Sequence, residues 1–150
     1  MAWCCYRFSE LSTQDLYQIL KLRSDVFVVE QNCAYPDIDN KDIQADVRHL
    51  FWREQGEIVA YLRLLPPDLS YPDMVSIGRV VVAPAGRGTG LGRKLIQQGL
   101  DECAELWPRN AVKIGAQTYL EDFYQSFGFE TVSESYLEDG IPHIDMLKVI

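Results

Sequence analysis

The sequence predicts an α/β fold (α+β) in which a mixed sheet is covered by helices on both faces. Three observations predict this class: short apolar or alternating segments typical of strands, segments whose apolar residues recur at helical spacing, and turn residues between them. The resulting order is strand, helices, three strands, helix, strand, helix, two strands. At 150 residues the chain has the length of one ordinary domain, which we place over residues 1–150.

The first part of the chain predicts a strand, a helix and a loop. The segment "AWCCYRF" (2–8) has strand character, and Ser12 with Asp15 three residues later resembles a capping box. Apolar residues then recur at near-helical spacing to about residue 28. From Pro36 the acidic run to residue 46 is typical of a loop that contains at most one short helix.

The middle of the chain predicts a hairpin followed by a long apolar strand. The segments 47–53 and 57–65 flank Glu54-Gln55-Gly56, which is a turn signal. A proline-containing loop leads to the β-branched run Val75–Val82, which we expect to be a central strand ending before Pro84. A helix of about four turns is then predicted from Leu91 to Leu106.

The last part predicts one strand, one short helix and a closing hairpin. The strand covers "AVKIGAQ" (111–117), and the helix covers "YLEDFYQSFGF" (119–129), with Gly128 as its C-cap. The closing strands lie around residues 129–137 and 142–150, separated by the turn Glu138-Asp139-Gly140.

Composition and charge exclude several classes of function. The chain is 47% apolar and 24% charged, as soluble globular proteins are, and no apolar run approaches the roughly 20 residues that cross a bilayer. The start "MAWCCYRFSE" lacks the basic and long apolar regions of a signal peptide, so we expect a cytoplasmic protein. The net charge of −8 predicts that it binds neither nucleic acid nor an acidic membrane.

The four cysteines do not predict a metal site. Cys4, Cys5, Cys33 and Cys103 form no C-x-x-C pair and have no histidines at metal-ligand spacing. We therefore expect them to be small apolar residues in a reducing compartment, and we expect no bound metal.

A glycine-rich loop, Arg87-Gly88-Thr89-Gly90-Leu91-Gly92, joins the predicted strand Val75–Val82 to the helix that follows. The dinucleotide pattern G-x-G-x-x-G fails because Arg93 occupies its last glycine position. The triphosphate pattern fails because no hydroxyl residue follows Lys94. The remaining R-x-x-G-x-G pattern lets backbone N–H groups and the positive end of a helix approach an anion such as a pyrophosphate.

These residues carry a resemblance to a known family. The strand "IGRVVVAP", the loop "RGTGLG" and the following helix resemble the acetyl-CoA motif of the GNAT superfamily of N-acetyltransferases. The segments "LRSDVFVVEQNCAYPDID", "FYQSFGF" and "YLEDGIPHIDM" are similar to the ElaA-type branch of that superfamily. The resemblance covers nearly the whole chain and implies a GNAT-like, mostly antiparallel sheet of six to seven strands.

The resemblance also implies a cosubstrate and a set of residues. Acetyl-CoA would lie with its pantetheine along the predicted strand and its pyrophosphate on the glycine loop, and a backbone N–H near Val80 or Val82 would polarise the thioester carbonyl. An amine would then attack directly, and Tyr124 would protonate the departing thiolate as general acid. The cofactor-binding residues implied are Val80, Val81, Val82, Arg87, Gly88, Thr89, Gly90, Leu91, Gly92 and Arg93.

The base that deprotonates the amine is not determined by the sequence. Glu30, His49 and His143 are all candidates, and we rank Glu30 and His143 as the acceptor-side residues. Both histidines lie in strand-like segments, where a structural histidine is at least as common as a base. Glu30 follows the apolar run "VFVV", so we expect it to face a cavity or a basic partner such as Arg23 or Arg79.

Other functions and partners stay open at this point. A non-catalytic CoA-binding regulatory module would keep the loop but transfer nothing, and an anion-binding interaction domain would not bind CoA. Acidic residues in the 30–46 and 138–145 regions suggest a small-molecule or peptide amine as the acceptor, although they are equally typical of ordinary surface. The closing hairpin offers an edge for a homodimer.

Overall fold

The computed structural model describes residues 3–150 and contains two four-stranded sheets. In the first sheet the strands follow one another in chain order and every neighbouring pair is antiparallel. Its strands are β1 (Cys4–Tyr6), β2 (Arg48–Glu54), β3 (Glu57–Leu65) and β4 (Ser76–Val82). The predicted hairpin at Gln55-Gly56 is confirmed, because β2 and β3 pair on either side of it.

The second sheet is built from the last part of the chain. Strand β8 (Ile141–Lys148) lies between β5 (Val112–Gln117) on one side and two short strands, β6 (Glu130–Thr131) and β7 (Tyr136–Glu138), on the other. The closing hairpin is confirmed. Its first strand, expected to be continuous over 129–137, is instead split into β6 and β7, so the described residues hold eight short strands in place of six to seven.

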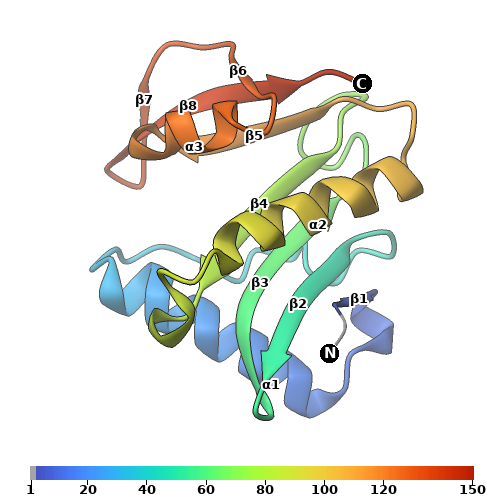
Figure 1. Ribbon diagram of the computed structural model, residues 1–150, viewed down its shortest axis with the longest axis vertical. Helices are drawn as coiled ribbons and strands as arrows, with labels where there is room; N and C mark the ends of the chain where they lie inside the picture. The colour runs from blue at the N-terminus through green and yellow to red at the C-terminus, as the bar shows by residue number, and fades with distance from the viewer. Residues whose placement is uncertain (1–2) are drawn as a thin grey trace.

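The two sheets meet at one point and then diverge (Figure 1). Val75 forms a parallel bridge with Val112, in which the Val75 N–H donates to the Ala111 carbonyl at 2.9 Å and the Lys113 N–H donates to the Val75 carbonyl at 2.8 Å. Beyond this bridge no further pairing joins β4 to β5 within residues 3–150. The sheet is therefore mixed and mostly antiparallel, as predicted, and it opens between its two central strands.

Helices cover both faces of the first sheet, which confirms the predicted class. Helix α2 (Leu91–Leu106) crosses β2, β3 and β4 on the viewer's side of Figure 1. It buries Leu95 and Ile96 in one core cluster with Leu62 and Ile77 of the sheet. On the opposite face α1 (Thr13–Arg23) packs its apolar side against Phe51, Tyr61 and Val81. Tyr61 and Leu62, which are neighbours on β3, pack on opposite faces of the sheet because successive side chains alternate across a strand.

The first helix begins at the predicted cap and then changes type. The Ser12 side chain accepts a hydrogen bond from the Asp15 N–H at 3.0 Å. From Ser24 to Glu30 the backbone continues as a π-helix, so the helical region ends close to the expected residue 28. The segment 36–46 contains turns but no helix. None of the described helices is long and apolar enough to span a membrane.

The remaining elements are one short helix and several 3₁₀ turns in the connections between the longer elements. A short helix α3 (Glu121–Gln125) follows β5, and Gly128 adopts a left-handed φ of 95° after it, as expected for a helix end. Within residues 3–150, 3₁₀ turns occur at Phe8–Glu10, Pro84–Gly86 and Thr118–Leu120.

Candidate active site

Strand β4 contains a β-bulge beside the opening between the sheets. The register of β3 and β4 shifts between the pairs Tyr61–Val81 and Arg63–Gly78, so that Arg79 and Val80 together lie opposite Leu62. Arg79 has a left-handed φ of 51°, which is uncommon for a residue with a side chain. A bulge leaves its extra residue unpaired, so backbone groups near Val80 are free to bind a ligand.

The side chain of Arg79 is held by the acidic loop that precedes β2. Its guanidinium lies 2.8 Å (Nε) from an Asp37 carboxylate oxygen and 3.3 Å (Nη2) from Asp39, and it donates to the Asp37 carbonyl at 3.0 Å. The same guanidinium stacks over the Tyr35 ring, 5.4 Å from its centroid. These contacts keep the unusual backbone conformation of Arg79 in place.

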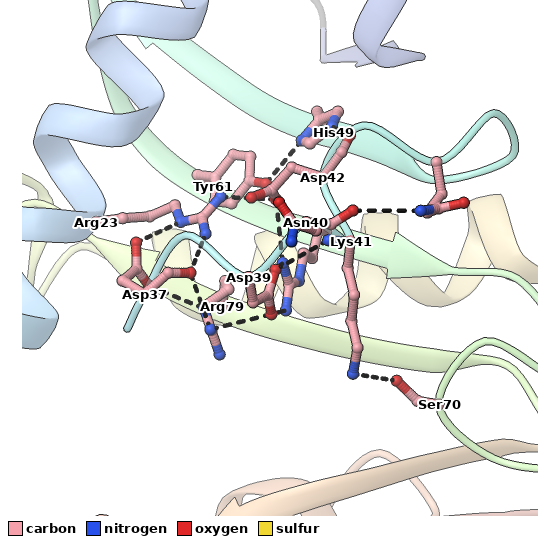
Figure 2. Close-up of polar contacts among 12 residues, drawn as sticks. Arg23, Asp37, Asp39, Asn40, Lys41, Asp42, His49, Tyr61, Ser70 and Arg79 are labelled. Carbon is pink, nitrogen blue, oxygen red and sulfur yellow. Dashed lines mark hydrogen bonds and ion pairs between the residues drawn. The ribbon is translucent and has the colours of Figure 1, made fainter. Parts of the chain in front are cut away.

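Two further arginines complete this cluster of buried ion pairs (Figure 2). Arg23, which is fully buried, contacts Asp37 at 2.9 Å and Asp42 at 2.8 Å. Arg63 contacts Asp39 at 2.6 Å and Asp42 at 3.1 Å. In pairs as deeply buried as those of Arg23, removing one partner costs about 3–5 kcal/mol.

The acidic loop is therefore a structural element. Burial disfavours the charged form of Asp39 and Asp42, but the hydrogen bonds and charges of the arginines outweigh it and hold the pKa of both carboxyls below its usual range. Sequence reasoning had treated this stretch as either a solvated loop or an acceptor-binding surface. Three of its carboxylates, Asp37, Asp39 and Asp42, are paired with arginines from α1, β3 and β4, so these carboxylates are not available to a cationic acceptor.

His49 belongs to the same cluster and is not exposed to a ligand. It is buried, with Nε2 3.0 Å from the Asp42 carbonyl and Nδ1 2.8 Å from the Tyr61 hydroxyl. Because a carbonyl only accepts, Nε2 carries the proton and Nδ1 accepts from Tyr61. Burial lowers the pKa of His49, so it stays neutral. Of the two readings considered for this residue, the structure favours the structural histidine.

A cavity of about 430 Å³ lies between the diverging strands β4 and β5. The bulge residues Arg79 and Val80 line one wall, and Tyr124 and His143 line others. The loops 31–41 and 70–71 and the β7–β8 hairpin close the remaining sides. The cavity thus brings together Val80 and two of the predicted catalytic side chains, which come from three distant parts of the chain.

Tyr124 is a buried side chain whose ring is fixed by aromatic neighbours. It is 7% exposed and packs edge to face against Phe123 and Phe129, with ring centroids 5.2 and 5.8 Å away. Burial raises its pKa to about 12, so the hydroxyl keeps its proton at neutral pH. Within the described residues this hydroxyl has no hydrogen-bond partner, which leaves it available to a ligand in the cavity.

His143 has one ring nitrogen occupied and one available. Its Nδ1 lies 2.7 Å from the Ile141 carbonyl, so Nδ1 carries a proton in that hydrogen bond. Its Nε2 is then unprotonated in the neutral ring and lies 3.6 Å from a Glu138 carboxylate oxygen. The ring stacks on Tyr136 at 6.1 Å. This arrangement suits a group that accepts a proton at Nε2.

The glycine loop has the open backbone that its sequence predicts. Gly88 and Gly90 have left-handed φ values of 78° and 80°, and a Cβ atom at either position would meet nothing within 4 Å. The glycines are therefore required by the backbone conformation, and the space above them is free for a ligand. The Thr89 hydroxyl donates to the Gly86 carbonyl at 2.6 Å and closes the turn before α2.

Some side chains of the predicted cofactor set point into the protein. Leu91 and Val81 are buried in the cores on either side of the sheet, so only their backbone groups could contact a ligand. Arg93 lies over the Phe127 ring, 4.7 Å from its centroid, and donates to the Ser126 hydroxyl at 3.1 Å. Arg93 thereby ties the start of α2 to the segment that carries Tyr124.

Glu30 does not lie with the other predicted catalytic residues. Its carboxylate forms a two-contact ion pair with Arg87, at 3.0 and 2.8 Å, and it lines a separate hollow formed by α1 and the turn at Pro84. It was expected beside a cavity or beside Arg23 or Arg79, and its partner is Arg87. The structure therefore does not bring Glu30 to Tyr124 and His143.

Two residues of the cavity wall could not be placed there from the sequence. The role of Arg79 depends on strand register, although a charged residue inside the apolar run "IGRVVV" was a signal of something unusual. Lys41 on the cavity wall gave no signal, because it stands in an acidic loop. Across residues 3–150, no group of three or more His, Cys, Asp or Glu side chains is arranged to hold a metal ion.

The chain is similar to known proteins over nearly its whole length. Residues 18–150 match the family of the acetyltransferase (GNAT) domain. Protein ElaA of Escherichia coli is 48% identical over 148 residues, which cover 99% of this chain and 96% of the relative. Its crystal structure superposes with a TM-score of 0.92 over 98% of each chain.

Two further solved structures share the fold. An acyl-CoA N-acyltransferase from Pseudomonas aeruginosa is 42% identical and superposes with a TM-score of 0.94 over 99% of this chain and 100% of its own. An aminoglycoside 6′-N-acetyltransferase complexed with coenzyme A is 14% identical, with a TM-score of 0.68 over 97% and 96% of the two chains. At that identity the likeness shows the fold alone.

Proposed function

This chain belongs to the GNAT acetyltransferase family, and from that premise we propose that it transfers the acetyl group of acetyl-CoA to a primary amine by direct attack in a ternary complex. One observation carries the proposal: the bulged strand at Val80, the buried Tyr124 and the available nitrogen of His143 line a single cavity. The acceptor is a small-molecule or peptide amine.

The residues of the glycine loop fit the donor. The open space above Gly88 and Gly90 and the N-terminus of the 16-residue helix α2 together suit a pyrophosphate, which accepts hydrogen bonds from backbone N–H groups. The edge of β4 at Val80–Val82 pairs with no further strand in the described chain, although the Val82 carbonyl accepts from Arg87, and this edge suits the amide groups of pantetheine. The acyl-CoA N-acyltransferase from Pseudomonas aeruginosa, which is 42% identical to this chain, supports a CoA-type donor here.

The proposed reaction forms a C–N bond and an S–H bond and breaks a C–S bond and an N–H bond. The amine nitrogen attacks the thioester carbonyl carbon, a backbone N–H at the bulge stabilises the oxyanion, and the C–S bond then breaks. His143 Nε2 takes the proton that the amine loses, and Glu138 stabilises the resulting imidazolium. The Tyr124 hydroxyl gives its proton to the departing thiolate, so that free CoA thiol and an N-acetyl product leave the site.

The main alternative is a CoA-binding regulatory module that transfers nothing. The same experiment separates the two: acetyl-CoA is incubated with a broad panel of primary amines, and the release of CoA thiol is followed. Transfer predicts thiol release that depends on both amine and enzyme, with acetylated amine found by mass spectrometry. Binding of CoA, seen as a thermal shift, with no release from any amine would establish the module instead.

The cytoplasm stays the expected location. We propose it because Cys4, Cys5, Cys33 and Cys103 are free cysteines, which are common in reducing compartments.

A further inference from the structure

The cations that line the cavity differ in whether they have a counter-ion. Arg63 and Arg79 are paired with the carboxylates of the acidic loop. The ammonium of Lys41, also on the cavity wall, donates to the Ser70 hydroxyl at 3.1 Å. No carboxylate of the described chain lies within 4.0 Å of it, since none of the ion pairs there involves Lys41. Lys41 is therefore a cation with no charge partner in the cavity.

The backbone of the acidic loop directs Lys41 away from the nearest carboxylate. The Lys41 N–H donates to Asp39 at 3.2 Å, and both Asp39 oxygens are already engaged by Arg63. Figure 2 shows the Lys41 side chain leaving the arginine–aspartate cluster and extending to Ser70 on the loop between β3 and β4. Lys41 is half-buried there, and a half-buried cation with no counter-ion favours the binding of an anion.

The opposite charge lies on a different wall of the same cavity. Glu138 and His143 belong to the β7–β8 hairpin, and the carboxylate of Glu138 has only His143 beside it in the described ion pairs. The segment 33–41 runs between the two walls, because the Cys33 thiol donates to the Asp139 carbonyl at 3.5 Å at its start and Lys41 reaches Ser70 at its end. The cavity thus has an acidic wall and a basic wall.

The space between these walls is bordered by aromatic hydroxyl groups. A Cβ atom placed on Gly115 would lie 3.1 Å from the Tyr136 hydroxyl and 3.9 Å from that of Tyr71. The two tyrosines therefore approach each other over β5 from the β7 side and from the Ser70 loop. The cavity lining that contains Lys41 and His143 therefore also contains the hydroxyl groups of Ser70, Tyr71 and Tyr136.

We propose that the acceptor is an amine that also carries an anionic group, a carboxylate or a phosphate, and that Lys41 with Ser70 binds this group while the amine faces His143. The inference rests on the proposed function and narrows its substrate class. It disfavours diamines and polyamines, because their second ammonium would lie beside Lys41. Lys41 acts here as a specificity-determining residue that does not touch the reacting atoms.

The test uses pairs of acceptors that differ only in the anionic group. Tyrosine is compared with tyramine, and phosphoethanolamine with ethanolamine, by thiol release at saturating acetyl-CoA. The proteins are wild type, Lys41→Met, Lys41→Arg and the control Lys21→Met, whose lysine is exposed on α1 and paired with Asp25. Thermal unfolding of each protein checks that it is folded.

In wild type and Lys21→Met, we expect at least one anionic acceptor to exceed its neutral partner in kcat/KM by about tenfold or more, the usual effect of one charge-assisted hydrogen bond. Lys41→Met should remove this ratio through KM, and Lys41→Arg should restore most of it. A general folding defect would lower both members of a pair equally and leave the ratio unchanged. The pair that shows the ratio identifies a carboxylate or a phosphate.

Two results would overturn the inference. In the first, thiol release is seen, but the neutral amines match their anionic partners in both pairs, or the preference for the anionic partner survives in Lys41→Met. Either outcome rules out the role of Lys41 and leaves acetyl transfer intact. Absence of thiol release with every amine of the broad panel removes the proposed function, and the inference falls with it.

Discussion

The carboxylate of Glu30 binds the guanidinium of Arg87 through two contacts, 3.0 Å from Oε1 to Nη1 and 2.8 Å from Oε2 to Nη2. The same guanidinium donates from Nε to the Val82 carbonyl at 3.1 Å. Arg87 therefore connects three parts of the molecule: the end of the π-helix, the end of β4 and the first position of the glycine loop. The ion pair fixes the start of the glycine loop and leaves the Glu30 carboxylate paired with Arg87.

Replacing Glu30 by Gln should keep kcat within about threefold of wild type. Glu30 lies outside the cavity that contains Tyr124 and His143, and an ion pair this exposed contributes about 0–1 kcal/mol to stability. His143→Gln, measured in parallel, should lower kcat/KM by about 10²-fold, the lower range for a general base. A large loss in Glu30→Gln with His143→Gln unaffected would transfer the role of base to Glu30.

Replacing Tyr124 by Phe should lower kcat by about 10²-fold and leave the Kd for CoA unchanged. The substitution removes only the hydroxyl, which has no partner within the described chain, and it keeps the ring in its aromatic contacts. The matched control is Tyr119→Phe, since Tyr119 is 75% exposed on the preceding turn. Equal kcat values for Tyr124→Phe and wild type would show that another group protonates the thiolate.

The backbone of Arg79 can be tested with a pair of variants of similar size. Arg79→Asn and Arg79→Val both lose the contacts to Asp37 and Asp39, but only Asn tolerates the left-handed φ of 51°. We expect Arg79→Val to be less stable than Arg79→Asn by about 1–2 kcal/mol in urea unfolding and to have the lower kcat. Equal stability and equal kcat would mean that the bulge does not depend on this conformation.

The buried ion pairs predict a loss of stability in acid. The pKa values of Asp39 and Asp42 are lowered in the folded protein, so both carboxyls bind protons more tightly when the chain unfolds. Their contribution is present above the unfolded value near 3.9 and is lost as the pH falls below it. Urea unfolding from pH 7 to pH 3 should show this decline.

In Asp39→Asn, the free energy of unfolding should fall by roughly 1–3 kcal/mol at pH 7 and should depend less on acid than that of wild type. Asp25→Asn, which alters an exposed pair with Lys21, serves as the control and should keep the wild-type acid dependence. Parallel acid profiles for Asp39→Asn and wild type would contradict the assignment.

The elements that the sequence predicted well are those with local signals. The turn at Gln55-Gly56, the cap at Ser12 and the glycine loop each depend on residues within a few positions of one another. The features that were not predicted involve partners far apart in the chain. The ion pairs of the acidic loop are an example, because Arg63 and Arg79 lie 24 and 40 residues away from Asp39.

The site followed the same rule. The open backbone of the glycine loop could be predicted, because Gly88, Gly90 and Gly92 stand at alternate positions of one short segment. Glu30 has the basic partner that was expected, but its identity as Arg87 could not be predicted, because Arg87 is 57 positions away. The bulge at Arg79 and the division of the last strand into β6 and β7 depend on register, which residue pattern alone does not determine.

The bridge between Val75 and Val112 joins two sheets that come from successive parts of the chain. All strands of the first sheet come from residues before 83 and all strands of the second from residues after 111, so each half is assembled from its own stretch of chain. Val80 belongs to the first half, and Tyr124 and His143 belong to the second. The alignment of these groups is therefore a property of how the halves dock, and a substitution at the Val75–Val112 joint can abolish turnover without altering any residue that meets a substrate.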